Sequence, residues 1–369
     1  MLIPATYQVA LFLMIVAAVC WGSWAVTQKM AGSKWRFELY YIDFALGTLF
    51  GALLICFTAG SIEGNEITFL DSLVGISLRK TAIAMAAGLV FNLANVLIVT
   101  SISVSGMSVA FPISMSIATI LTLATNYFLK PQGNATMLFT GLLVLMLAVI
   151  FGARAYRMLS EVRRAQQVTA EAEAAAALPE VQASQLPPSK SPRVRKTGKS
   201  KAVSAKGVVL SVIAGFIMAA VLPLVDSARE GDLGLSPYST LLFFSIGLLF
   251  TSSLVIPFLM NFPVEGSPLG LKQYLQGSAG WHLLGVAGGM LWIGGLAAYT
   301  LAASVPTAQN VGPVITQAAG QGATILAALW GVVVWKEYSN SGSRATMQLM
   351  IMFVMLALGL ALTALASLY

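Results

Sequence analysis

The stretch VPTAQNVGPVITQAAGQGATILAALWGVVVWKE, from Val305 to Glu337, decides how this chain folds. It is long and apolar enough to cross a bilayer, which takes roughly 20 such residues. Four polar residues in it fall on one helix face, at offsets of seven, eleven and fourteen from the first: Asn310, Gln317, Gln321 and Thr324. Amides without partners are costly in hydrocarbon, so this face must point at other helices or at a watery cavity. We therefore expect the rest of the chain to surround it.

The composition is that of a polytopic membrane protein. The 369-residue chain is 57% hydrophobic and only 9% charged, whereas a soluble domain carries about 25% charged residues. The net charge is +7, but the basic residues gather in particular loops, which indicates membrane orientation rather than a nucleic-acid partner. One histidine, His282, excludes a multi-histidine metal site, and two cysteines in apolar runs make no disulfide framework. We expect no metal and no cofactor.

The chain divides into two sets of apolar runs. Residues 157–205 separate them: the first half of this segment is charged and rich in Ala and Glu, which predicts a helical extension. The second half is basic and contains prolines, which predicts a partly disordered linker. The fold class is therefore all-α, with a first five-helix repeat at 1–156, the linker at 157–205 and a second five-helix repeat at 206–369. The ten expected spans are at about 8–30, 39–60, 82–103, 106–128, 134–156, 207–226, 238–260, 281–302, 306–334 and 344–367.

Lysines and arginines set the expected orientation. They concentrate after the first, fifth and ninth runs, and the linker contains a cluster from Lys190 to Lys206. Loops rich in Lys and Arg stay in the cytoplasm, so we expect the linker inside and both termini outside. A bacterial inner membrane is the simplest location. The basic linker would also attract anionic lipid.

The two halves resemble each other. FALGTLFGALL (44–54) is similar to FSIGLLFTSSL (244–254), an offset of 200, and ATIL occurs at both 118–121 and 323–326, an offset of 205. Because five is an odd number, the second set of helices must cross the membrane in the opposite direction. Inverted repeats of this kind are typical of secondary transporters, whose binding sites lie near the bilayer midplane.

Polar and aromatic residues inside the runs point to a site for a neutral solute. Amides hydrogen-bond to polar solutes, and aromatic rings stack on the faces of sugars or bases. The alternatives are interfacial anchoring for the tryptophans and ordinary helix packing for the other residues. Helix breaks are expected at Pro112 and Pro313. The candidate substrate-binding residues are Trp21, Trp24, Asn92, Asn95, Ser116, Trp292, Tyr299, Asn310, Gln317 and Gln321.

Carboxylates inside the runs are rare. Asp43 and Asp226 either pair with Arg36 and Arg229 at the interface or, where desolvated, carry a coupling proton. No cluster of buried charges is present to neutralise an ionic substrate. A single histidine also fails to supply the constellation that an intramembrane enzyme needs, so we expect a transporter and not an enzyme.

Five segments resemble a known family: CWGSWAVTQK (20–29), KWRFELYYIDFALG (34–47), FNLANVL (91–97), GMSVAFPI (106–113) and GQGATILAALWGVVVWKE (320–337). Together with ten helices in two inverted repeats, they resemble the drug/metabolite transporter superfamily, and within it the glucose/ribose porter or ureide permease branch. The resemblance implies a central cavity and alternating-access transport of a sugar or of a ureide- or nucleobase-like solute. An exporter of metabolites or drugs is the alternative within the same superfamily.

Overall fold

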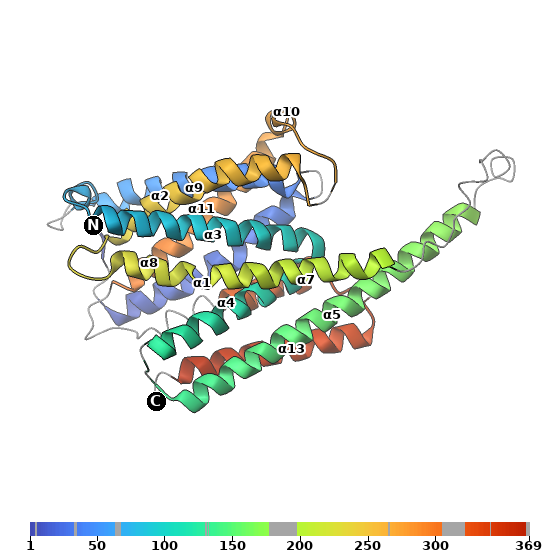
Figure 1. Ribbon diagram of the computed structural model, residues 1–369. Coiled ribbons are helices and arrows are strands. Elements are labelled where there is room, and N and C mark those ends of the chain that lie inside the picture. Colours follow the sequence, from blue (N-terminus) through green and yellow to red (C-terminus); the bar gives the residue numbers. More distant parts are fainter. Residues whose placement is uncertain are drawn as a thin grey trace.

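The computed structural model is a bundle of long helices (Figure 1). It describes residues 1–3, 6–32, 35–62, 68–129, 131, 133–176, 198–264, 266–304, 322–339 and 341–366. The main helices are α1 (Tyr7–Ala31), α2 (Phe37–Phe57), α3 (Leu78–Ser105), α4 (Met107–Leu129), α5 (Ala135–Ala176), α7 (Gly198–Met218), α8 (Val221–Arg229), α9 (Pro237–Asn261), α11 (Ala279–Ala302) and α13 (Ser343–Leu365). Shorter elements are η1 (Ala59–Ser61), η2 (Asp71–Leu73), α10 (Leu271–Leu275) and the π-helical turn η5 (Trp330–Val334).

In the described part of the chain, nine helices are long and apolar enough to cross a membrane. Large apolar side chains such as Phe12, Phe50, Phe250 and Val354 are exposed on them, as lipid-facing positions require. A further apolar helix, Gly322–Val334, is shorter, because most of the ninth expected span lies outside the described residues. The all-α membrane architecture is confirmed, and the count of ten spans stays a prediction.

Local sequence explains where several helices start. The side chains of Ser77, Ser236 and Ser278 each accept a hydrogen bond from the backbone N–H three residues later, at the starts of α3, α9 and α11. Such a cap satisfies one of the N–H groups that a helix start leaves without a partner. The serines thereby fix the points at which these spans begin.

The bundle has two distinct ends. At one end α5 finishes and α7 begins, and the last turns of α5 project beyond the other helices (Figure 1). We call this the linker end, and the opposite end, where both termini lie, the terminal end. The projection agrees with the helical extension expected after residue 156. Helix α7 begins at Gly198, inside the segment expected to be a linker.

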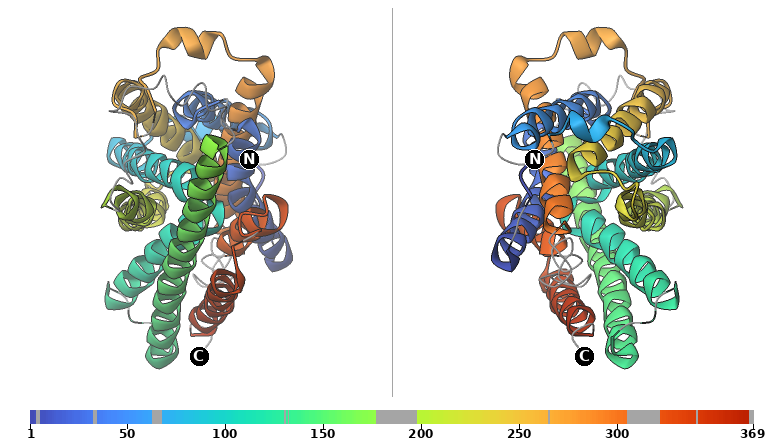
Figure 2. Two further views of the ribbon diagram at one scale, coloured as in Figure 1. Left: turned by 90° about the vertical axis from the view of Figure 1, so that its right-hand side faces the viewer. Right: turned by 90° about the vertical axis from the view of Figure 1, so that its left-hand side faces the viewer.

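Two groups of helices make up the core. One apolar cluster joins α1, α2, α3, α9 and α11 with parts of α4, α7 and α8, and a second joins α4, α5 and α13. Figure 2 shows α5 and α13 side by side, on the opposite side of the bundle from α9 and α10. The space between the two groups is where a solute site can form.

Pro112 does not break its helix, contrary to expectation. Helix α4 is continuous and Pro112 is its sixth residue, so only the Ser108 carbonyl loses its helical partner. The interruption occurs instead in the sixth span, between Met218 at the end of α7 and Val221 at the start of α8. Pro223 lies in the first turn of α8, where a missing N–H is tolerated.

Candidate functional site

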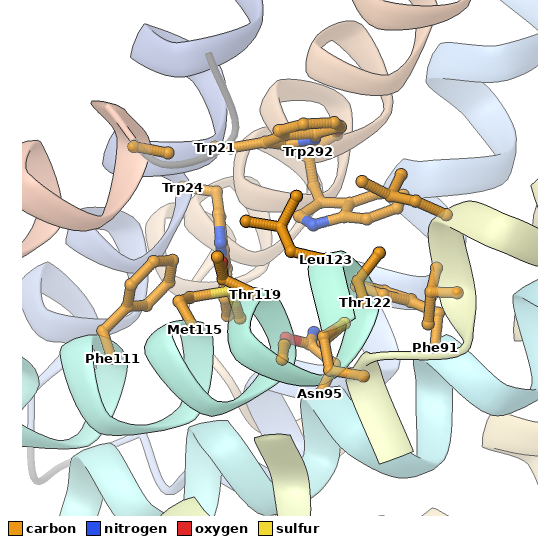
Figure 3. Close-up of a pocket in the computed structure, with 15 residues that line it drawn as sticks. Trp21, Trp24, Phe91, Asn95, Phe111, Met115, Thr119, Thr122, Leu123 and Trp292 are labelled. Carbon is orange, nitrogen blue, oxygen red and sulfur yellow. The ribbon is translucent and has the colours of Figure 1, made fainter. Parts of the chain in front are cut away.

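An aromatic pocket of about 120 Å³ lies where α1, α3, α4, α8 and α11 meet (Figure 3). Every side chain that lines it in the described part of the chain is uncharged, and most are apolar. The lining residues are Trp21, Trp24, Phe91, Asn95, Phe111, Met115, Ala118, Thr119, Thr122, Leu123, Met218, Val221, Leu222, Trp292 and Ala323. The pocket is therefore suited to a neutral solute with flat apolar faces.

Ring contacts hold the aromatic wall rigidly. The rings of Trp292, Phe91 and Phe244 form one cluster, with Trp292 at a centroid distance of 3.8 Å from Phe91 and 5.2 Å from Phe244. The indole Nε1 of Trp21 donates to the Trp292 carbonyl at 3.2 Å, which ties α1 to α11. Trp24 lies across the pocket, where its ring contacts that of Phe44 behind it at 5.2 Å. The wall thus needs little reorganisation to receive a planar ligand.

Asn95 provides the pocket's amide. Its Nδ2 donates to the hydroxyl of Tyr41, a fully buried residue of α2, at 3.0 Å. The indole N–H groups of Trp24 and Trp292 and the hydroxyl of Thr119 have no hydrogen-bond partner among the described residues. Figure 3 shows the side chains of Trp24, Asn95, Thr119 and Trp292 around one space. Donors and an amide are therefore available to a ligand.

The structure divides the predicted binding residues into three sets. Four line the pocket: Trp21, Trp24, Asn95 and Trp292. Three do not line it among the described residues, and their role in binding stays a prediction: Asn92, Ser116 and Tyr299. The last three, Asn310, Gln317 and Gln321, lie outside the described residues, as does Pro313.

Two of these three residues have partners within the protein, Asn92 and Tyr299. Asn92 Oδ1 accepts from the Ser252 hydroxyl at 2.9 Å, so this amide packs α3 against α9. Ser116 is buried but is not among the lining residues. Tyr299 lies behind the wall, where its ring is 5.7 Å from that of Trp21. Helices α3 and α4 are each buried on two faces. Helix periodicity alone did not tell which of the two faces lines the pocket.

Asp43 has a partner that sequence reasoning missed. Its carboxylate lies 2.9 Å from Nδ1 of His282 and accepts from the Tyr274 hydroxyl at 2.6 Å, while Arg36 pairs with Glu38 instead. Burial, together with the neighbouring carboxylate, raises the pKa of Tyr274 above its ordinary value. This cluster joins α2 to α10 and α11 at the linker end and does not line the pocket.

The close approach of α2 and α11 at Asp43 has a sequence signal. A Cβ at Gly285 would lie 2.4 Å from the Asp43 Cβ, and Gly285 follows His282 by almost one helical turn. A glycine next to the single histidine on one helix face is the pattern that could have indicated this contact.

Asp226 is linked to the pocket wall. It accepts from the Tyr299 hydroxyl at 3.1 Å, and the Tyr299 ring contacts Trp21. Its neighbour Arg229 donates to the Thr300 carbonyl at 2.7 Å and to the Ser304 hydroxyl at 2.6 Å. Tyr299 thus separates the Asp226 side chain from Trp21 of the pocket lining, and Asp226 lies toward the terminal end.

Comparisons with known proteins agree with a transport site. Residues 40–186 match the family model for ureide permeases. The chain is similar to Ureide permease 1 and Ureide permease 2 of Arabidopsis thaliana, with 25% identity to each over 94% of this chain and 94% of each relative. A shorter match to Probable ureide permease A3 of Vigna unguiculata has 31% identity over 39% of each protein.

The fold is also found in a solved crystal structure. The TM-score is 0.53 at 13% sequence identity, and the match covers 97% of this chain and 98% of that one. This likeness concerns the fold alone. The relatives above are named permeases rather than enzymes, which confirms the expectation that the chain is not an enzyme.

Proposed function

We propose, from the similarity to ureide permeases over almost the whole chain, that this protein carries a small neutral ureide-type solute across a membrane by alternating access. The observation that carries the proposal is the uncharged aromatic pocket between the two halves of the chain. Its lining comes from α1, α3 and α4 of the first half and from α8 and α11 of the second. A ligand held there would be released to either side by movement of one half against the other.

The polar groups of the pocket fit a ureide. A cyclic ureide has flat faces and alternates carbonyl acceptors with N–H donors around its edge. The faces match the rings of Trp292 and Trp24, the carbonyls match their indole N–H groups, which have no partner in the described part of the chain, and the edge matches the Asn95 amide. Several complementary groups therefore converge on one small molecule.

A sugar is the second candidate, because the sequence also resembles glucose/ribose porters of the drug/metabolite transporter superfamily. A sugar needs a hydrogen-bond partner for most of its hydroxyls. The described lining supplies mainly aromatic and aliphatic surface, with Asn95, Thr119 and Thr122 as its polar side chains, and the Thr122 hydroxyl already donates to the Ala219 carbonyl at 2.9 Å. This balance favours the ureide.

Paired glycine contacts support the inverted repeat. A Cβ at Gly88 of α3 would lie 2.0 Å from the Phe244 carbonyl oxygen of α9. At an offset of about 200, a Cβ at Gly289 of α11 would lie 2.1 Å from the Phe44 carbonyl oxygen of α2. The contact of α3 with α9 thus has a counterpart in the contact of α11 with α2. Two related halves would produce such a pair of contacts.

If transport is coupled to protons, Asp226 is the better candidate carrier of the two carboxylates. Its contact with Tyr299 places it directly behind the pocket wall at Trp21. Asp43 is instead held by His282 and Tyr274, away from the pocket lining. Asp226→Asn is expected to abolish the dependence of uptake on a proton gradient, whereas Asp43→Asn is expected to preserve it.

The distribution of Lys and Arg supports an orientation in which the linker end faces the cytoplasm. Arg157, Arg163 and Arg164 all lie in the second half of α5, which ends in the projecting turns at that end. An impermeant thiol reagent is expected to label Thr169→Cys, on the same projection, only after cells are opened. The same basic surface would contact anionic lipid, so binding of the protein to vesicles is expected to increase with their content of anionic lipid.

The main test is uptake and thermal stabilisation with a panel of ureides, purines and sugars. Allantoin, a cyclic ureide, is expected to raise the melting temperature of the purified protein, and glucose is not. Asn95→Ala is expected to weaken allantoin binding about tenfold, because it leaves a polar edge of the ligand unpaired. Ser116→Ala, which is buried nearby but does not line the pocket, is the matched control. Absence of any ureide effect on stability and on uptake would refute the proposal.

A further inference from the structure

One carboxylate joins several helices at the linker end. Glu337 follows η5, and its Oε1 lies 2.6 Å from Nζ of Lys29, near the end of α1. The backbone N–H groups of Met107 and Ser108, the first two residues of α4, each donate to this carboxylate at 2.9 Å, and the Ser108 hydroxyl donates as well. Arg163 of α5 donates to the Glu337 carbonyl at 2.7 Å. Helices α1, α4 and α5 therefore meet at a single residue.

The surrounding backbone is shaped around this side chain. A Cβ at either Gly106 or Gly331 would lie 2.9 Å from Glu337 Oε2, so only glycine leaves room for the carboxylate. Lys336 has φ 49°, in the left-handed region that side chains other than glycine seldom adopt. The π-helical turn η5, a form that often occurs at functional sites, comes directly before it. Unusual local geometry thus presents Glu337 to α4.

This cluster lies just beyond the pocket. On α1, Lys29 comes five residues after Trp24, and on α4, Ser108 comes three residues before Phe111. At 1.5 Å per residue these separations are about 7 Å and about 5 Å along the helix axes. The rings of Trp24 and Phe111 line the pocket and are 6.5 Å apart. A path from the pocket to the linker end would therefore pass the cluster.

We propose that Lys29, Glu337 and the first turn of α4 form a latch that holds the linker end shut, and that the Lys29–Glu337 ion pair must break for the pocket to open there. The latch rests on the proposed transport function, because its residues would determine at which end of the bundle the pocket is open. The carboxylate is satisfied by a cation and by the N-terminus of a helix, two partners that separate once α1 and α4 move apart. Water entering the path would then solvate all three groups.

The test measures access to the pocket from the linker end without any solute. In a chain with Cys20→Ala and Cys56→Ser, Ala118→Cys places one thiol in the pocket lining. A charged, impermeant methanethiosulfonate is applied to sided vesicles, and a parallel chain with Thr169→Cys shows which vesicles expose the linker end. The rate of labelling at position 118 is the readout.

Lys29→Gln and Glu337→Gln are each expected to raise labelling from the linker end about tenfold, the effect of losing a charge-assisted contact that favours one of two states. Lys29→Arg keeps the charge and is expected to leave the rate low. Glu161→Gln neutralises the exposed pair with Arg157 on α5 and is the control that changes charge at the same end without touching the latch. Unchanged labelling in both glutamine variants would overturn the latch. Because no solute is present, that result is distinct from a failure of ureides to bind, which would overturn the proposed function instead.

Discussion

Different contacts hold the helices together at the two ends of the bundle. At the linker end, the Lys29 ammonium meets the buried carboxylate of Glu337, which also accepts from the start of α4. At the terminal end, Arg229 occupies the position 200 residues after Lys29 but donates to neutral acceptors, the Thr300 carbonyl and the Ser304 hydroxyl. Among the described residues, the first end thus has an ion pair between helices, whereas Arg229 at the second donates to neutral acceptors and has the Asp226 carboxylate as a charged neighbour.

The sequence shows the origin of this difference. The offset of 205 that aligns the two ATIL segments pairs Glu337 with Gln132, so the first half carries an amide where the second half carries an acid. Under the proposed repeat, the two halves therefore differ at this position. A transporter whose two ends were equally stable would spend equal time open to each side, whereas this asymmetry favours the state that is shut at the linker end.

The largest expected effect comes from deleting the acid. Glu337→Ala leaves Lys29 and the first N–H groups of α4 without their partner, which we expect to cost about 3 kcal/mol in the free energy of unfolding. Thermal melting of the purified protein measures this loss. A melting temperature equal to that of the wild type would show that the linker end is not held by this residue.

A smaller effect is expected at the terminal end. Arg229→Gln removes hydrogen bonds from a charged donor to neutral acceptors, a loss of about 2 kcal/mol. The same melting experiment is expected to show a smaller decrease than Glu337→Ala. A larger decrease than that of Glu337→Ala would mean that the contacts at the terminal end stabilise the protein more than those at the linker end.

The difference between the ends also predicts a dependence on pH. Burial raises the pKa of Glu337, but the Lys29 ammonium and the hydrogen bonds from Lys29 and Ser108 outweigh it and hold the pKa below its ordinary value of 4.5. The latch therefore contributes its full stability above pH 4.5 and loses it as the pH falls through the lowered pKa. Melting temperatures of the wild type and of Glu337→Gln are expected to converge only in acid. A constant difference down to about pH 2 would contradict the assignment.

The smallest effect is expected from an ion pair that joins no helices. Arg157 and Glu161 form an exposed pair within α5, four residues apart. Glu161→Gln is expected to change stability by less than about 0.5 kcal/mol. A larger change would mean that net charge at the linker end, rather than the latch itself, determines the effects above.

Periodicity predicted part of the site. The spacing of Trp21 and Trp24, and the intramembrane amide of Asn95, marked residues that do line the pocket. Asn92 was marked by the same reasoning, yet it bonds to Ser252, because a helix that is buried on two sides gives the same polar signal on both. Phe91 and Phe111 gave no signal, since an apolar residue that faces a cavity looks like any packing residue.

Long-range pairs could not be predicted at all. Lys29 and Glu337 are far apart in sequence, and neither the polar face of the 305–337 stretch nor the family resemblance of 20–29 indicated that they pair. His282 was used to exclude a metal site, and its contact with Asp43 depends on how closely α11 approaches α2. Such pairs follow from the packing of whole helices, which the pattern within one helix does not determine.

The central claim is that the aromatic pocket binds a ureide. Three tryptophans line the pocket: Trp21, Trp24 and Trp292. The intrinsic fluorescence of the protein therefore reports directly whether a ligand occupies the pocket. Titration with allantoin is expected to give a saturable change that Asn95→Ala shifts to about tenfold higher concentration, while glucose gives none. A flat titration with allantoin and with other ureides, in a protein that melts normally, would contradict the claim.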